Sequence, residues 1–302
     1  MKIGIKVDYN ENVGLGHFKR CYTLAKLLAE KYQIVFFSND RLPLKSEFKL
    51  VKASNDLNFL IEITSDMKID IIVLDHYDLL VQKFNYTKMF TPQVVIFDDF
   101  NLKLKCKLII RHNVFSKQRE RNILTGIKYP LTANIFFERK AIKSPKYDFT
   151  FYISEIENKR EILNIFFSKN YDKKICILSR ANLFKKEKFD SRNLDFFYNI
   201  ESRQILEIFS NSKILVLPAS VISQEGYMNN NKMILYYESE NQRKIFDASP
   251  NDSNIFKLDS FENLLLKEYD DFILTKKDLI YVPTLDKIQS DFIKKFSLIN
   301  KI

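Results

Sequence analysis

The sequence predicts an α/β protein built from two doubly wound halves. Short and almost continuous apolar runs alternate along the chain with stretches whose apolar residues recur every three or four positions. Such runs are typical of parallel strands that helices cover on both faces. The pattern breaks off once at a polar stretch and then restarts, and 302 residues are enough for two domains of ordinary size.

The first half begins with a strand at residues 3–7, and a helix follows it. The apolar face of that helix is expected to consist of Phe18, Cys21, Leu24, Ala25 and Leu28. Further strands of this half are expected at residues 33–38, 69–75, 93–99 and 107–113.

A polar linker at residues 138–146 separates the halves, so we expect one domain at 1–140 and another at 146–302. The second half restarts with a strand at 147–154 and a helix that runs to about residue 168. Its further strands are expected at 173–179, 213–220 and 232–237.

The last segment of the chain predicts an amphipathic helix. Its apolar positions follow one another at three- and four-residue steps: Leu285, Ile288, Phe292, Phe296 and Ile299. We expect this helix to pack on the body of the protein, and peripheral contact with a membrane surface is the alternative.

Composition excludes several classes of protein. The formal net charge of +10 favours anionic ligands, but the basic residues are mixed with 38 acidic ones and form no stripe for nucleic acid. The three cysteines, Cys21, Cys106 and Cys176, suggest neither a disulfide framework nor a zinc site, which favours a reducing cytoplasm. An integral membrane segment is not expected, because no apolar run of about 18 residues occurs. The oligomeric state stays open.

Polar side chains follow the predicted strands of the first half. Asp8 follows the first strand, Asp75 ends a later one, and Asp98 and Asn113 come at the ends of the next two. The carboxyl ends of parallel strands share one edge of a sheet, and ligands bind there. All three histidines of the chain also follow such strands, but their spacing matches no metal-binding signature, so no metal is expected.

A glycine-containing loop opens the first helix. Gly14 and Gly16 would allow the backbone a positive φ angle and let a ligand approach closely. His17 would then lie at the positive end of the helix, which favours its neutral form and suits a general base. Arg20, one turn further, would hold a carboxylate or a phosphate. An ordinary strand-to-helix turn with a solvated histidine is the alternative.

These motifs resemble a known family, the UDP-2,4-diacetamido-2,4,6-trideoxy-β-L-altropyranose hydrolases of pseudaminic acid biosynthesis. Those enzymes share the GT-B fold, in which two Rossmann-like domains face a cleft. The resemblance runs over residues 1 to about 245. It is carried by D-x(5)-G-x-G-H-x-x-R at 8–20, DHY at 75–77, FDD at 97–99, N-V-x-x-K at 113–117, G-x-x-Y-x-L at 126–131, KYDF at 146–149, Ser220 with Glu225, and NQ at 241–242.

The resemblance implies roles for single residues. His17 would activate water for attack at the anomeric carbon, and Tyr77 and Asn241 would line the sugar site. Ser220 and Glu225 would hold the nucleotide, with Gln242 beside them. The reaction would release UDP with inversion and would use neither a metal nor an organic cofactor.

The second half departs from the family at one turn. The family carries Met-Gly-Gly after the first strand of this domain, where the chain reads Ile153, Ser154 and Glu155. A glutamate beside a diphosphate would repel it by about 1 to 4 kcal/mol at a separation of ~4 Å. Two alternatives to a hydrolase therefore stay open: a GT-B glycosyltransferase and a catalytically degenerate binding protein.

Overall fold

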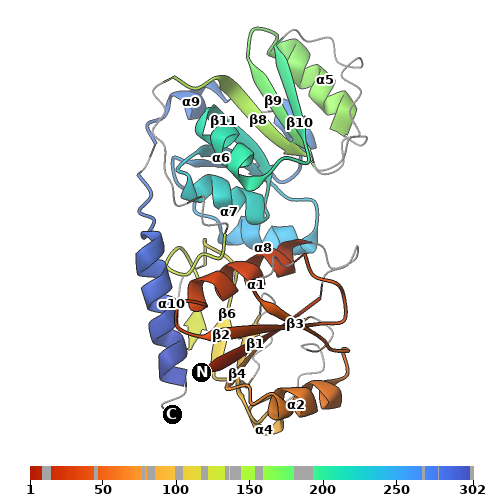
Figure 1. Cartoon of the computed structure of the whole chain (residues 1–302). Coiled ribbons are helices and arrows are strands. Elements are labelled where there is room, and N and C mark those ends of the chain that lie inside the picture. Colours follow the sequence, from red (N-terminus) through yellow and green to blue (C-terminus); the bar gives the residue numbers. More distant parts are fainter. Residues whose placement is uncertain are drawn as a thin grey trace. The chain divides into compact units, whose positions relative to one another are not determined.

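The chain forms two compact units, which Figure 1 shows in one view. Unit 1 comprises Met1–Ala133 together with Pro283–Ile302, and unit 2 comprises Asn134–Val282. The computed structural model describes residues 1–8, 15–43, 47–76, 79, 86–98, 105–116, 122–132, 136, 144–153, 159–179, 193–266, 269–277 and 279–299, without the side chains of residues 15, 87, 241 and 270.

Unit 1 is built on a parallel sheet with the strand order β3-β2-β1-β4-β5-β6-β7. Its strands are β1 (Lys2–Val7), β2 (Gln33–Ser38), β3 (Lys49–Lys52), β4 (Ile71–Asp75), β5 (Gln93–Phe97), β6 (Leu108–Ile110) and β7 (Ile123–Leu124). The direction of the strand order reverses between β1 and β4, which is where open α/β sheets bind ligands.

Helices cover the unit 1 sheet, and buried apolar side chains pack between the helices and the strands. The helices are α1 (Leu15–Leu28), α2 (Leu57–Asp66), α4 (Tyr86–Met89) and α10 (Leu285–Ile299). Leu60 of α2 and Tyr86 of α4 pack with apolar side chains of β2, β4 and β5 in one buried cluster. Gly4 leaves room for that packing, because a Cβ there would lie 2.7 Å from the Phe37 ring.

The last helix, α10, belongs to unit 1, which corrects the expected boundary of the C-terminal domain at residue 302. Figure 1 shows it beside the N-terminal elements. The Tyr32 hydroxyl lies 2.7 Å from Ser297 Oγ, and the ring of Tyr129 meets Phe292 edge-on at 5.4 Å. The buried face of α10, which includes Ile288 and Phe296, explains this placement, because those side chains need an apolar surface to cover them.

Unit 2 repeats the same architecture with the strand order β10-β9-β8-β11-β12-β13, again parallel throughout. Its strands are β8 (Tyr147–Ile153), β9 (Ile175–Ser179), β10 (Leu194–Tyr198), β11 (Ser212–Pro218), β12 (Lys232–Tyr236) and β13 (Ile255–Lys257). Its helices are α5 (Arg160–Lys169), α6 (Ser202–Ser210), α7 (Val221–Met228), α8 (Glu240–Ala248), the 3-10 turn η4 (Glu262–Leu265) and α9 (Asp270–Leu274).

The core of unit 2 is rich in phenylalanine. Phe149 and Phe151 of β8 meet Phe166 of α5 edge-on at 5.2 and 5.3 Å. Gly226 brings α7 close to the sheet, because a Cβ there would lie 2.9 Å from Leu215 Cδ1. Close packing of α7 on the sheet therefore explains why residue 226 is a glycine.

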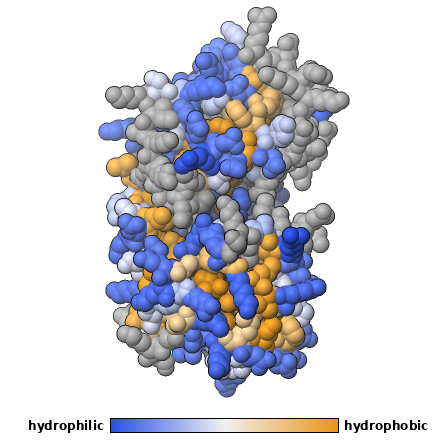
Figure 2. Space-filling model, in the orientation of Figure 1, coloured by the Kyte–Doolittle hydropathy of each residue, from blue (hydrophilic) through white to orange (hydrophobic). Residues whose placement is uncertain are grey.

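Figure 2 shows hydrophilic residues over much of the face that it displays, with smaller groups of hydrophobic ones between them. Among the described helices, none has the length and apolar character that crossing a membrane requires.

Candidate functional site

The candidate site lies at the carboxyl edge of the unit 1 sheet, where the strand order reverses. Asp75 is the last residue of β4, and it pairs with Val7 at the end of β1. Asp8 therefore emerges beside it on the neighbouring strand. His17 is the third residue of α1, the helix that follows β1. Sequence reasoning placed these side chains at one edge, and the structure brings them together.

Asp75 is the centre of one hydrogen-bonded cluster. Arg20 donates to it twice, from Nε to Oδ2 at 2.7 Å and from Nη2 to Oδ1 at 2.6 Å. His17 Nδ1 lies 2.7 Å from Oδ1, and the thiol of Cys21 donates to Oδ2 at 3.3 Å. The Asp75 side chain is fully buried. A buried carboxylate with this many donors holds its neighbours in fixed positions.

The charge of Asp75 is secured by its surroundings. Burial raises the pKa of its carboxyl, but the adjacent Arg20 guanidinium and the His17 hydrogen bond outweigh this and hold that pKa well below its usual range. Burial and the nearby Asp75 charge raise the pKa of the Cys21 thiol well above normal. Cys21 therefore stays a thiol and acts as a hydrogen-bond donor.

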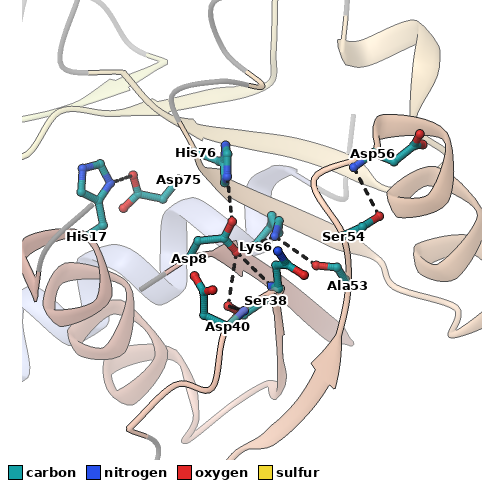
Figure 3. Close-up of polar contacts among 11 residues, drawn as sticks. Lys6, Asp8, His17, Ser38, Asp40, Ala53, Ser54, Asp56, Asp75 and His76 are labelled. Atoms are coloured by element: carbon teal, nitrogen blue, oxygen red, sulfur yellow. Dashed lines mark hydrogen bonds and ion pairs between the residues drawn. The ribbon is translucent and has the colours of Figure 1, made fainter. Parts of the chain in front are cut away.

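This ionised carboxylate fixes the tautomer of His17. An ionised Asp75 only accepts hydrogen bonds, so Nδ1 of His17 carries the hydrogen that the two share. Arg20 Nη2 also lies 3.2 Å from that nitrogen. Both atoms are donors, so they lie close together because both bind the same oxygen of Asp75, Oδ1. The other ring nitrogen, Nε2, points away from Asp75 (Figure 3) and is the one that can accept a proton.

A second cluster is centred on Asp8. Its Oδ2 lies 2.8 Å from His76 Nε2, and its Oδ1 accepts hydrogen bonds from Lys6 Nζ at 2.6 Å, Asn39 N at 3.1 Å and Ser38 Oγ at 3.2 Å. Figure 3 shows the two clusters side by side. Burial raises the pKa of Asp8, but the His76 and Lys6 hydrogen bonds reverse this and hold that pKa well below normal.

Lys6 is a charge placed inside the sheet. Its side chain is fully buried, and Nζ reaches both Asp8 and, at 3.3 Å, the carbonyl oxygen of Ala53. Burial lowers the pKa of Lys6, and the hydrogen bond to Asp8 opposes that shift. Sequence reasoning missed Lys6, although a lysine within an otherwise apolar strand was a signal that a buried partner exists.

One expectation for the opening loop needs correction. Gly16 lies inside α1 and is not among the positive-φ glycines, and a Cβ there would meet nothing within 4 Å, so neither the turn nor close packing requires it. Arg20 was expected to hold a carboxylate or a phosphate, and two of its nitrogens bind the Asp75 carboxylate. A contact between Arg20 and substrate stays a prediction. Its guanidinium also lies 4.8 Å from the centroid of the Phe97 ring.

Asp98 and Asn113 were expected to bind substrate. Asp98 is fully buried, and Arg111 Nη2 lies 3.9 Å from its Oδ2. The side-chain oxygen of Asn113 accepts a hydrogen bond from Phe115 N at 2.9 Å, and its carbonyl oxygen accepts one from Gly126 N at 3.1 Å. Asn113 thus helps to form the loop that Gly126 closes.

The expected nucleotide residues belong to α7, including its N-cap, and to α8, which follow strands β11 and β12 of unit 2. Ser220 is the N-cap of α7, and its N–H donates to Ser223 Oγ at 3.1 Å. Glu225 is buried in the same helix. Gln242 Oε1 accepts a hydrogen bond from Glu238 N at 2.8 Å, which stabilises the start of α8.

Some expected site residues are not described. Tyr77, Gly14, Ser154 and Glu155 lie outside the described residues, as does the side chain of Asn241. Within the described part of the chain, no group of three or more histidine, cysteine, aspartate and glutamate side chains is arranged to hold a metal ion.

Known proteins place this geometry in context. No protein-family model matches the chain. A curated relative, the UDP-2,4-diacetamido-2,4,6-trideoxy-β-L-altropyranose hydrolase of Campylobacter jejuni subsp. jejuni, is 26% identical over 262 residues, which cover 80% of this chain and 93% of the relative. The chain is therefore a divergent relative of that hydrolase.

Solved structures share the fold along almost the whole chain. MurG of Acinetobacter baumannii matches with a TM-score of 0.60 and 11% identity, covering 100% of both chains. The Methanocaldococcus jannaschii UDP-GlcNAc 2-epimerase, solved with UDP-GlcNAc and UDP, matches with a TM-score of 0.61 and 12% identity, again covering 100% of both. The glycosyltransferase VinC, in complex with dTDP, matches with a TM-score of 0.65 and 10% identity, covering 100% of this chain and 97% of its own. The chain has the GT-B fold. At these identities the GT-B structures bear on the fold alone.

Proposed function

We propose that the protein hydrolyses a UDP-linked diacetamido-type sugar of a surface-glycan pathway similar to pseudaminic acid synthesis. The observation that carries this proposal is the His17–Asp75 pair, because a buried, ionised carboxylate orients the imidazole so that Nε2 is the proton acceptor. The distant relationship to a UDP-sugar hydrolase supports it independently.

The step follows from the orientation of the base. His17 Nε2 takes a proton from water while the water oxygen forms a bond to the anomeric carbon. The bond between that carbon and the phosphate oxygen breaks, and its electron pair leaves with UDP. Arg20 and Cys21 act indirectly, because they fix Asp75, which in turn fixes His17. Direct attack by water inverts the anomeric configuration.

The nucleotide would bind at the carboxyl edge of the unit 2 sheet. Ser220 and Glu225 lie on α7, which follows β11, and β11 adjoins β8 where the strand order reverses. A carboxylate such as Glu225 can accept the ribose hydroxyls. Tyr77 and Asn241 would contact the sugar, and Gln242 would lie beside the nucleotide.

The test is incubation with UDP-linked diacetamido sugars in ¹⁸O-labelled water. We expect release of free sugar that carries the label, seen by mass spectrometry, with an inverted anomer in early NMR spectra. His17→Asn is the matched variant, because its amide can still donate to Asp75 while no acceptor remains at the position of Nε2. Turnover unchanged in this variant would overturn the proposal.

The same preparation separates the two alternatives. A glycosyltransferase would transfer the sugar to an added acceptor and release little to water. A degenerate binding protein would show no turnover, and calorimetry with UDP would then tell whether the nucleotide site persists.

A further inference from the structure

Two histidine–aspartate pairs lie next to each other at the site, and the proposed reaction uses one of them. His17 is bonded to Asp75, and His76 is bonded to Asp8. Val7 and Asp75 are register partners on adjacent strands, which lie about 4.8 Å apart. Asp8 is the next residue after Val7, so the backbones of Asp8 and Asp75 are close neighbours. Figure 3 shows both pairs in the same view.

The orientation of His76 is fixed as firmly as that of His17. Asp8 is ionised, so it only accepts, and His76 Nε2 must carry the hydrogen that points to Oδ2. The charged groups around this pair are Lys6 on Asp8 Oδ1, Asp40 near Lys6, and the adjacent Asp75 cluster. In the neutral ring, Nδ1 is then a hydrogen-bond acceptor.

That acceptor is buried and has no partner among the described residues. His76 is 6% exposed, and its Nδ1 makes no hydrogen bond to the part of the chain that the structure describes. Buried polar atoms in native proteins almost always have a partner, and an exception at a functional site indicates a ligand or a bound water. Nδ1 of His76 takes no part in the hydrogen bonds that Asp8 accepts. The described contacts of Asp8 therefore do not explain the buried acceptor.

We propose that Nδ1 of His76 accepts a hydrogen bond from an N–H or O–H group of the bound sugar. This inference rests on the proposed function, because it assigns His76 to the same sugar site. His76 is a substrate-binding residue in it and not the base. The acetamido N–H groups of a diacetamido sugar are the donors that it fits, and a sugar hydroxyl has the same chemistry.

Two substitutions separate the functions of the two ring nitrogens. His76→Gln can keep a donor for Asp8 at the position of Nε2 but has no acceptor at Nδ1. His76→Asn places an amide at the position of Nδ1 and loses the bond to Asp8. We expect His76→Gln to melt like the wild type and to lose roughly 10- to 100-fold in kcat/KM, mainly through KM. His76→Asn should melt at a lower temperature but lose less in KM.

Substrate analogues identify the donor. An analogue with azide in place of an acetamido group has no N–H at that position. If the amide is the donor, this analogue should be processed equally well by the wild type and by His76→Gln, whereas the diacetamido sugar separates them. If a hydroxyl is the donor, the corresponding deoxy sugar is the analogue that the wild type and His76→Gln should process equally well. Equal kcat/KM for the wild type and His76→Gln on the full substrate would overturn the inference.

Binding distinguishes this inference from the proposed function. In the His17→Asn background, His76→Gln should weaken binding of the UDP-sugar by the same 10- to 100-fold, measured by calorimetry. Binding that depends on His76, without turnover in the wild type, would overturn hydrolysis and support the sugar contact. Turnover that is indifferent to His76→Gln would overturn the contact alone.

Discussion

The substitution Asp75→Asn tests the centre of the candidate site with the smallest change in shape. It replaces one carboxylate oxygen by an NH₂ group and removes the charge. In the wild type, Oδ1 faces Arg20 Nη2 and His17 Nδ1, while Oδ2 faces Arg20 Nε and Cys21 Sγ. Each oxygen therefore accepts from two donors, and an amide nitrogen can accept from none of them.

The amide has two orientations, and each disrupts a different function. With its nitrogen at the place of Oδ2, Arg20 Nε loses its acceptor and the guanidinium loses its counter-charge. With its nitrogen at the place of Oδ1, the amide donates to His17 Nδ1, which forces the hydrogen onto Nε2 and removes the base. Arg20 also loses the Nη2 contact in this second orientation.

The magnitudes follow from burial. The side chains of Asp75 and Arg20 are 0% and 7% exposed, so removing the carboxylate leaves a buried cation without its counter-charge. Breaking a pair of this kind costs about 3–5 kcal/mol of unfolding free energy. The wrong tautomer at a histidine base lowers kcat by about 10⁴-fold in a comparable dyad. Urea unfolding followed by far-UV circular dichroism, together with the ¹⁸O assay, measures both effects.

His17→Asn is the matched control for this prediction. Its side-chain amide can donate to Asp75 as Nδ1 does, so it should abolish turnover while changing the unfolding free energy by less than about 1 kcal/mol. The reasoning is refuted if Asp75→Asn retains activity within tenfold of the wild type. A stability loss below about 1 kcal/mol would show that Arg20 does not depend on Asp75 for its charge.

Three further results are expected. Gly126→Ala should destabilise unit 1 by about 1–3 kcal/mol in urea unfolding, because Gly126 has a φ of 76° and a Cβ there would collide with the backbone oxygen of Ser116. Gly16→Ala, in α1 with open space around it, should instead stabilise by about 0.5–1 kcal/mol. The folded-state pKa values of Asp75 and Asp8 lie below the unfolded value of about 3.9, so their stabilisation is present above pH ~4 and is lost as the pH falls below it. The urea midpoint of the wild type should therefore fall more steeply from about pH 6 to 3 than that of Asp75→Asn. Lys159→Met should lower the unfolding free energy by about 1.5–3 kcal/mol, because Lys159 is buried and paired with Glu238. Lys213→Met breaks a half-exposed pair with Asp148 and should lower it by less than about 1 kcal/mol in the same assay.

Periodicity predicted the interior strands of both sheets, because each of them is a short, almost continuous apolar run. The four edge strands were missed. β3 and β10 carry exposed side chains such as Lys49 and Tyr198 and lack a continuous apolar run, and β7 and β13 are only 2 and 3 residues long. The partner of α10 could not be predicted either. Its apolar face is compatible with any apolar surface, and only the folded chain shows that unit 1 provides it.

The site shows the same division between what spacing reveals and what only folding reveals. The expectation of a parallel sheet was enough to predict that Asp8, His17 and Asp75 lie at one edge, because the carboxyl ends of parallel strands meet there. It could not tell that Arg20 would bind Asp75, because an arginine one turn into a helix reaches a ligand and a neighbouring carboxylate equally well.

Buried charge is what unifies the two clusters. Each consists of an ionised aspartate that a buried cation neutralises, Arg20 at Asp75 and Lys6 at Asp8, and each presents one histidine in a fixed orientation. Replacing such a pair by apolar residues is often neutral or stabilising, so stability alone does not account for two of them at one edge of a sheet. A histidine whose ring is held by an ionised carboxylate keeps its remaining nitrogen aimed in one direction. That property serves a base in one cluster and, by our inference, a sugar contact in the other.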